Sequence, residues 1–138
     1  MKKAIVVVDM QNDFVDGALG TAEAQAMLPR MVEKLTAARA AGTALVFTMD
    51  THGADYLTTQ EGEHLPVPHC IRGTAGWAIV EALRPFADAA AAVIEKPTFG
   101  ATALPAALAD YDAIEFVGLC TDICVISNAL LVKAFYPE

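Results

Sequence analysis

Positively charged residues are scarce in this sequence. Lysine and arginine together number 9 against 17 aspartates and glutamates, which gives a formal net charge of −8 at pH 7. Proteins that bind the phosphate backbone of nucleic acids need clustered lysine and arginine, which this chain lacks. The composition therefore argues against a nucleic-acid partner, and we expect a small-molecule ligand instead.

Cysteine and long hydrophobic runs are also rare. Cys70, Cys120 and Cys124 are an odd number of thiols in a chain without a secretion signal, so we expect no disulfide framework and take the cytoplasm as the default compartment. Two lysines precede an apolar run, as in a signal peptide, but the run ends at Asp9 and is too short. No stretch approaches the length of a membrane span, so we expect no membrane partner.

Hydrophobic residues are abundant, at 55% of the chain, and their spacing predicts strands that alternate with helices. The predicted strands are residues 4–8, 44–49, 91–95 and 113–119. Predicted helices run from Pro29 to Gly42 and over residues 74–83, 98–109 and 122–135, the last apolar on nearly every face and therefore buried. Residues 1–138 are expected to form a single α/β domain, a doubly wound parallel sheet with helices on both faces.

Reactive side chains follow the predicted strands at their carboxyl ends. Asp9 follows the first strand, Asp50 and His52 follow the second, Lys96 follows the third, and Cys124 lies just after the fourth. In doubly wound sheets, ligands bind in the crevice outside these strand ends. The five residues are therefore expected to converge on one site.

The strand and turn before Cys124 place this thiol on the first turn of a helix. Thr121 is a suitable N-cap, and the Cys124 sulfur would then lie near unpaired N–H groups and the positive end of the helix dipole, which favours the thiolate. The alternative interpretation is a small buried thiol without reactivity, the commonest state of a free cysteine. Residues elsewhere in the chain have to decide between the two.

A thiolate that attacks an amide needs an acid or base and donors for the oxyanion. Asp9 is a candidate acid/base, and Lys96 would keep thiolate and carboxylate ionised. The backbone N–H groups of Cys120 and Cys124 are candidate oxyanion donors. Alternatively, Asp9 only caps a turn and Lys96 is a surface lysine at the end of a strand.

A second group of residues suits a divalent metal ion. Asp50, His52 and His69 offer one carboxylate and two imidazoles, which fits a first-row ion with open positions for water or substrate. We expect zinc, with manganese or iron as alternatives. Candidates for a fourth ligand lie in the loop between His52 and His69, which is too long for an idle connector; they are Glu61, Glu63 and His64. Without other evidence, histidines in loops are more often solvated than bound to metal.

Five stretches of the sequence resemble the isochorismatase-like cysteine hydrolases, most closely the nicotinamidase/pyrazinamidase group. They span nearly the whole chain in the family's order: residues 8–14, the pair Asp50 and His52, residues 68–70, residues 96–99 and residues 118–125. The resemblance implies the family's three-layer fold. It also implies a catalytic triad of Asp9, Lys96 and Cys124, and a metal held by Asp50, His52 and His69.

The resemblance further implies how the substrate is bound and converted. Cys124 would form an acyl-enzyme that water hydrolyses to the acid and ammonia, after a cis peptide bond between Leu119 and Cys120. Phe14 would line the pocket for the pyridine ring. Leu65 stands near the position where some nicotinamidases carry an aromatic residue, which makes it the second candidate for substrate binding.

The leading hypothesis is a cysteine amidohydrolase that deamidates nicotinamide or a similar heteroaromatic amide, such as pyrazinamide. The alternatives are an amidohydrolase of carbamoyl or ureido compounds with the same triad, and a catalytically silent domain that binds metal or a small ligand. The family normally continues with more sheet and a closing helix after the position of Glu138, so we expect a chain truncated at its C-terminus that lacks the last strand and helix. A homo-oligomer is possible.

Overall fold

The computed structural model describes residues 1–138 and contains one parallel sheet of four strands. The strands are β1 (Lys3–Val8), β2 (Ala44–Asp50), β3 (Ala92–Lys96) and β4 (Ala113–Gly118), in the spatial order β3-β2-β1-β4. Their β-branched runs suit strands that are covered on both faces. The predicted doubly wound sheet is confirmed, and all four predicted strands are present with bounds shifted by one residue or so.

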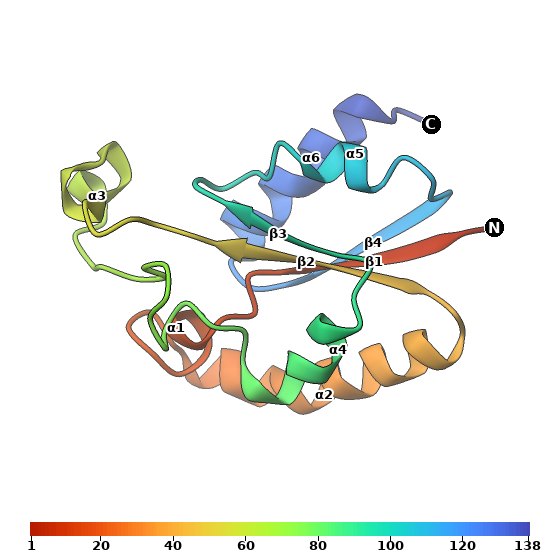
Figure 1. Cartoon of the computed structure of the whole chain (residues 1–138), viewed down its shortest axis with the longest axis horizontal. Coiled ribbons are helices and arrows are strands. Elements are labelled where there is room, and N and C mark those ends of the chain that lie inside the picture. Colours follow the sequence, from red (N-terminus) through yellow and green to blue (C-terminus); the bar gives the residue numbers. More distant parts are fainter.

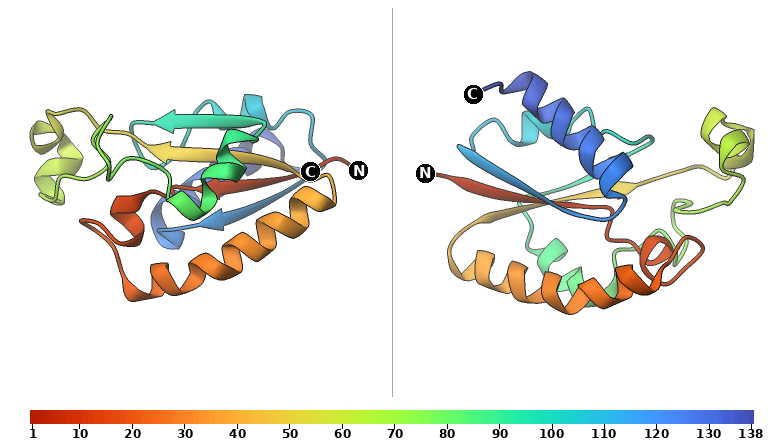
Figure 2. Two further views of the ribbon diagram at one scale, coloured as in Figure 1. Left: turned by 60° about the horizontal axis from the view of Figure 1, so that its bottom comes forward. Right: turned by 180° about the vertical axis from the view of Figure 1, so that it is seen from behind.

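Helices cover both faces of this sheet (Figures 1 and 2). The long helix α2 (Ala22–Ala40) and the short helix α4 (Arg84–Asp88) lie on one face, and α5 (Leu104–Ala107) and α6 (Ile126–Phe135) lie on the other. Short helices make up the rest: α1 (Asn12–Val15), η1 (Tyr56–Thr58), α3 (Gln60–His64), η2 (Glu81–Leu83) and the π-helix η3 (Thr121–Val125). None of the helices combines the length and apolar character needed to cross a membrane.

The core is divided by the sheet into two apolar clusters. Successive side chains of a strand point to opposite faces, so Ile5 and Val7 of β1 pack with Met31 and Leu35 of α2, whereas Val6 joins the cluster on the α6 face. The buried sheet fixes the positions of its strand ends, and the candidate residues sit at those ends.

The predicted helices are less accurate than the strands. Helix α2 begins at Ala22 and carries Pro29 in its interior, because the Thr21 side chain accepts a hydrogen bond from the Ala24 N–H and caps an earlier start. Of the helix predicted over residues 98–109, only α5 is helical in the structure. The last helix was expected to be buried, but Ile126, Leu130 and Phe135 are 44%, 62% and 62% exposed, because no further element packs on that side of α6.

The helix predicted over residues 74–83 is absent. Backbone groups of this segment bond to the chain after β1: the Asn12 N–H donates to the Ala78 carbonyl at 3.0 Å, and the Val80 N–H donates to the Met10 carbonyl at 3.0 Å. Residues 74–80 therefore form a loop bonded to the chain after β1, and η2 at the end of the segment leads into α4.

Candidate active site and metal centre

The carboxyl edge of the sheet gathers the reactive residues that the sequence analysis identified. Asp9 follows β1, Asp50 ends β2, Lys96 ends β3, and Cys124 lies in η3, directly after β4. All four side chains are buried. The strand order places β1 and β4 side by side although they are far apart in sequence, so Asp9 and Cys124 meet at the point where the connections change direction.

Asp9 and Lys96 form a buried ion pair. The Lys96 Nζ lies 2.8 Å from the Asp9 Oδ2, and the Thr48 hydroxyl donates to the Asp9 Oδ1 at 2.8 Å. Burial raises the pKa of Asp9 although Lys96 acts to lower it. The alternative of a surface lysine at position 96 is wrong, since its side chain is fully buried.

The two oxygens of Asp9 differ in their surroundings. Oδ1 accepts the hydrogen bond from Thr48, whereas Oδ2 accepts no hydrogen bond of good geometry in spite of its short distance to Lys96. A buried carboxylate oxygen that is held by charge and keeps a free lone pair is suited to accept a proton.

Three residues at this edge adopt the left-handed backbone region that side chains other than glycine avoid. Asp9, Cys70 and Cys120 have φ values of +52°, +48° and +58°. Such conformations cost of order 1–3 kcal/mol each and cluster at functional sites. In this chain they follow β1, flank His69 and precede Cys124, so each lies next to a candidate catalytic or metal-binding position.

The turn between β4 and η3 brings the Cys124 thiol to the sheet. Gly118 has a φ of +133°, and a Cβ atom there would lie 2.2 Å from the Val8 carbonyl oxygen, so only glycine fits beside β1. The expected cis bond between Leu119 and Cys120 is wrong, because all peptide bonds are trans. The left-handed backbone at Cys120, and not a cis bond, reverses the chain direction. Cys120, and not the predicted Thr121, is the N-cap residue, and its side chain makes no capping hydrogen bond.

The backbone donors around Cys124 fall into two groups. The N–H groups of Ile123 and Val125 both donate to the Cys120 carbonyl, at 3.0 and 3.1 Å, and are therefore already engaged. The N–H groups of Cys120 and Cys124 stay the candidates for an oxyanion.

Cys124 does not show the lowered pKa that the sequence analysis expected. Its contact with the Cys120 thiol, its burial and the nearby Asp9 carboxylate raise the pKa of the Cys124 thiol, and Lys96 only partly opposes them. The raised pKa favours the protonated thiol over the thiolate. A nucleophilic Cys124 therefore needs a base, and Asp9 is the carboxylate beside it.

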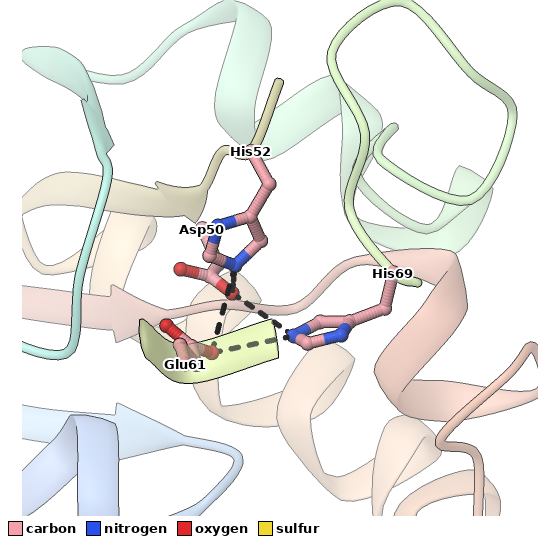
Figure 3. Close-up of side chains that lie close together, drawn as sticks. All are labelled: Asp50, His52, Glu61 and His69. Carbon is pink, nitrogen blue, oxygen red and sulfur yellow. Dashed lines mark hydrogen bonds and ion pairs between the residues drawn. The ribbon is translucent and has the colours of Figure 1, made fainter. Parts of the chain in front are cut away.

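Four side chains form a second cluster next to this pair (Figure 3). The Asp50 Oδ2 lies 2.9 Å from the His52 Nε2 and 3.5 Å from the His69 Nε2. The Glu61 Oε1 lies 3.7 Å from the His52 Nε2 and 3.8 Å from the His69 Nε2. All four ligand atoms lie within 4.8 Å of one another, as donors to one ion must.

The chemistry of this donor set fits a first-row divalent metal. The His69 Nδ1 donates to the Val67 carbonyl at 2.7 Å, which leaves the Nε2 lone pair directed at the other donors. Imidazole nitrogens and carboxylate oxygens are ligand types that zinc binds in proteins. Of the three candidates for a fourth ligand, only Glu61 joins the cluster. Glu63 and His64 are exposed, and the His64 Nδ1 bonds to the Gln60 carbonyl.

Asp50 connects the two clusters. One of its oxygens faces the histidines, and the other lies 3.5 Å from the Lys96 Nζ. Burial alone would raise the pKa of Asp50, but the contacts with the His52 and His69 rings and the charge of Lys96 lower it below its usual range. Asp50 therefore carries its negative charge between the Lys96 ammonium group and the two histidines. We call the group of Asp50, His52, Glu61 and His69 the metal-type cluster.

Two residues that support the cluster were missed by the sequence analysis. The buried Gln11 side chain donates to the Asp50 and Trp77 carbonyls at 2.8 Å and accepts from the Asp50 N–H at 2.8 Å. The Tyr56 ring packs edge-on against the rings of His52 and His69, with centroids 4.8 and 5.1 Å apart. Gln11 lies inside the stretch 8–14 that carries the family resemblance, but no local pattern marked Tyr56.

A cleft of about 690 Å³ opens beside the cluster. Leu65, Phe99 and Ile123 form its apolar lining, and His52 and Glu61 form part of its polar lining. Phe14 is not among the lining residues. It packs against the His69 ring with a centroid distance of 5.5 Å. The structure thus places Leu65 in the wall of the cleft, whereas Phe14 contacts His69 and does not line the cleft.

A thiol beside a buried aspartate–lysine pair, at the carboxyl edge of a doubly wound sheet, is suited to the chemistry of a cysteine hydrolase. The chain belongs to the isochorismatase family, because its sequence matches the model of the Isochorismatase domain over residues 3–135. The predicted family resemblance is thereby confirmed.

Three solved structures show what the chain is similar to. Nicotinamidase/pyrazinamidase PncA from Bacillus subtilis is 30% identical with a TM-score of 0.85, over 98% of this chain and 80% of that chain. N-carbamoylsarcosine amidase from Thermoplasma acidophilum is 29% identical with a TM-score of 0.81, over 99% and 78% of the two chains. The pyrazinamidase of Pyrococcus horikoshii in complex with zinc is 25% identical with a TM-score of 0.74, over 94% and 77%.

The family and these similarities make the chain a hydrolase that acts on non-peptide amide C–N bonds. The prediction of an enzyme of this class is confirmed. The similar structures include enzymes named for heteroaromatic amides and an enzyme named for a carbamoyl compound.

Proposed function

We propose that this protein is a metal-assisted cysteine amidohydrolase that deamidates nicotinamide, or a similar heteroaromatic amide such as pyrazinamide, to the carboxylic acid and ammonia. One observation carries the proposal: Lys96 lies 2.8 Å from Asp9 and 3.5 Å from Asp50. This contact joins the acid–base pair beside Cys124 to the metal-type cluster, so that the two groups act on one substrate.

The first half-reaction is proposed to begin with transfer of the Cys124 thiol proton to the Asp9 Oδ2. The sulfur then attacks the amide carbonyl carbon, a C–S bond forms, and the carbonyl oxygen becomes an oxyanion that the N–H groups of Cys120 and Cys124 stabilise. Asp9 returns the proton to the amide nitrogen, the C–N bond breaks, and ammonia leaves. The raised pKa of Asp9 supports both roles, because it makes the carboxylate a stronger base than a solvated aspartate.

The second half-reaction uses the same residues in reverse. Asp9 takes a proton from water, the water oxygen attacks the thioester carbonyl carbon, and the C–S bond breaks to release the carboxylic acid. The Cys124 sulfur recovers its proton from Asp9. Lys96 keeps its charge throughout and limits the free energy cost of the negative charge that moves between sulfur and carboxylate.

Asp50, His52, His69 and Glu61 would hold the metal ion, which we propose to be zinc, with manganese or iron as alternatives. When bound, the ion supplies a Lewis-acid site for a donor atom of the substrate ring or for water. The donor set and the zinc complex of the similar Pyrococcus horikoshii pyrazinamidase support this assignment.

Removal of the metal is expected to remove the activity. Dialysis against a chelator should lower ammonia release from nicotinamide by at least about 100-fold, and one equivalent of zinc should restore it, because the metal fixes the substrate's position. The His69→Ala variant should bind less than one metal ion per chain by elemental analysis. His64→Ala is the matched control, because His64 lies outside the cluster and should leave the metal content unchanged. Full activity of the metal-free protein would contradict the proposed metal role.

The cleft supports a small, flat, partly apolar substrate. Leu65 lines the cleft beside His52 and Glu61, and Phe14 would complete the ring site by fixing the His69 ring against which it packs. A heteroaromatic amide offers a flat apolar ring together with a nitrogen lone pair, which fits apolar walls next to a metal ion.

An amidohydrolase of carbamoyl or ureido compounds is the second candidate, supported by the similarity to N-carbamoylsarcosine amidase. A panel of nicotinamide, pyrazinamide, benzamide, N-carbamoylsarcosine and a ureido acid separates the two candidates by ammonia release. We expect kcat/KM for nicotinamide to exceed that for benzamide by at least tenfold, since nicotinamide carries a ring nitrogen for the metal and benzamide does not. Preference for N-carbamoylsarcosine would contradict the leading assignment and favour the second.

The unpaired state of Cys70, Cys120 and Cys124 supports a reducing compartment such as the cytoplasm. Nicotinate released there would feed the salvage of NAD, which is the proposed cellular use of the reaction.

A further inference from the structure

A fully buried amide lies one helical turn beyond Cys124. Asn128 of α6 is 0% exposed and uses its whole amide. Its Nδ2 donates to the Cys124 carbonyl at 2.8 Å and to the Phe99 carbonyl at 3.2 Å, and its Oδ1 accepts from the Ala101 N–H at 2.7 Å. Only this orientation of the amide pairs every donor with an acceptor.

The partners of Asn128 belong to two different segments. The Cys124 carbonyl is part of η3, whereas Phe99 and Ala101 belong to the loop that leads from Lys96 to α5. This loop also packs against α6, since a Cβ atom on Gly100 would lie 3.6 Å from the Leu131 Cδ2. Asn128 therefore ties the backbone of the candidate nucleophile to the loop after the lysine.

The same loop holds the Lys96 side chain. The Lys96 Nζ donates to the Thr98 carbonyl at 3.1 Å, and the next residue, Phe99, lines the cleft and bonds to Asn128. The Cys124 carbonyl is thus connected through Asn128 to Phe99, and through the neighbouring Thr98 to the Lys96 ammonium group beside Asp9.

The sheet does not supply this connection. β3, which carries Lys96, and β4, which leads to Cys124, are the two edge strands in the order β3-β2-β1-β4. Three inter-strand spacings separate them, about 14 Å at the usual strand spacing. Strand pairing therefore leaves the loop after β3 and the helix after β4 without a shared hydrogen bond, and the Asn128 side chain provides two, to Phe99 and Ala101.

We propose that Asn128 is a positioning residue that holds the Cys124 sulfur in register with Lys96 and with the cleft wall at Phe99. The inference rests on the proposed cysteine chemistry, although Asn128 itself touches neither substrate nor the reacting atoms. Small displacements of a nucleophile lower the rate of the chemical step more than they weaken binding. Loss of Asn128 therefore acts mainly on kcat.

Three substitutions separate the functions of the amide. Asn128→Leu removes all three hydrogen bonds, and Asn128→Asp keeps an acceptor for the Ala101 N–H but loses both donations. Asn128→Thr has a hydroxyl that reaches the Cys124 carbonyl four residues back and not the loop. Leu130→Ala is the matched control on the same helix, because Leu130 is 62% exposed.

We expect kcat for nicotinamide to fall about 100-fold in Asn128→Leu and Asn128→Asp, and about tenfold in Asn128→Thr, with KM changed less than threefold. Circular dichroism and metal content should match the wild-type protein, and Leu130→Ala should keep its kcat. A kcat within twofold of wild type in any folded Asn128→Leu or Asn128→Thr protein overturns the proposal, as does a loss confined to KM.

A readout that needs no turnover distinguishes this proposal from the proposed function. If the wild-type protein hydrolyses no amide of the panel, the proposed function fails, and labelling of Cys124 by iodoacetamide, followed by mass spectrometry, decides on Asn128. The labelling rate of Cys124 should fall at least fivefold in Asn128→Leu and Asn128→Thr and stay constant in Leu130→Ala. An unchanged or faster rate overturns the positioning role.

Discussion

Replacing Cys124 with alanine should lower the rate of ammonia release from nicotinamide by at least about 10⁴-fold, because no covalent intermediate can then form. The change removes one sulfur from a site that is otherwise held by backbone hydrogen bonds, so the fold and the metal content should persist. Ammonia is measured by a coupled assay at saturating substrate, and the metal by elemental analysis. A rate within tenfold of wild type would exclude Cys124 as the nucleophile.

Cys120→Ala is the matched control for this experiment. Cys120 contributes a backbone N–H to the proposed oxyanion site, and its thiol contacts Cys124 and raises the pKa of that thiol. Alanine keeps the backbone donor and removes the thiol contact, so we expect at most a tenfold change in rate. If Cys120→Ala abolished activity while Cys124→Ala did not, the roles of the two thiols would have to be exchanged.

Replacing Lys96 with methionine is expected to cost about 3–5 kcal/mol of the free energy of unfolding, because it leaves the buried Asp9 carboxylate without its counter-charge. Methionine has nearly the shape of lysine, so the loss reflects charge rather than volume. Activity should fall at least about 100-fold as well. Urea denaturation followed by circular dichroism measures the first effect, and ammonia release measures the second.

The double variant Asp9→Asn/Lys96→Met separates stability from catalysis. Asparagine tolerates the left-handed backbone at position 9, where φ is +52°, and it removes the unpaired charge. We expect this protein to recover most of the lost free energy of unfolding and to stay inactive, because the base is gone. A double variant as unstable as Lys96→Met alone would show that the ion pair is not the source of the loss.

The strands were predictable because each is a short apolar run buried on both faces. The helices were not, since their bounds depend on partners outside the local sequence. Thr21 starts α2 earlier than Pro29 indicated. Residues 74–83 have helical spacing, but their backbone groups bond to the chain after β1, and these tertiary bonds override the local preference.

The convergence of Asp9, Asp50, Lys96 and Cys124 followed from parallel strands alone, since their carboxyl ends share one edge of the sheet. Glu61 was only one of three candidates, because the sequence does not show which face of the short helix α3 turns toward the histidines. Asn128 bonds to residues 27 and 29 positions away, a distance at which no sequence pattern reports a side-chain contact. The trans turn at Cys120 was missed because the left-handed backbone at Cys120 reverses the chain direction, which the sequence analysis attributed to a cis bond.

The pairing of β1 with β4 also sets when the site can form during folding. Val8 pairs with Gly118, which closes a loop of 110 residues, whereas Ala4 pairs with Ala44 across 40. The longer closure costs only about 0.9 kcal/mol more in chain entropy, but such distant pairings form slowly. Asp9, Asp50 and Lys96 lie at the ends of strands joined by the shorter closures, so we expect the charged half of the site to assemble before the nucleophile arrives.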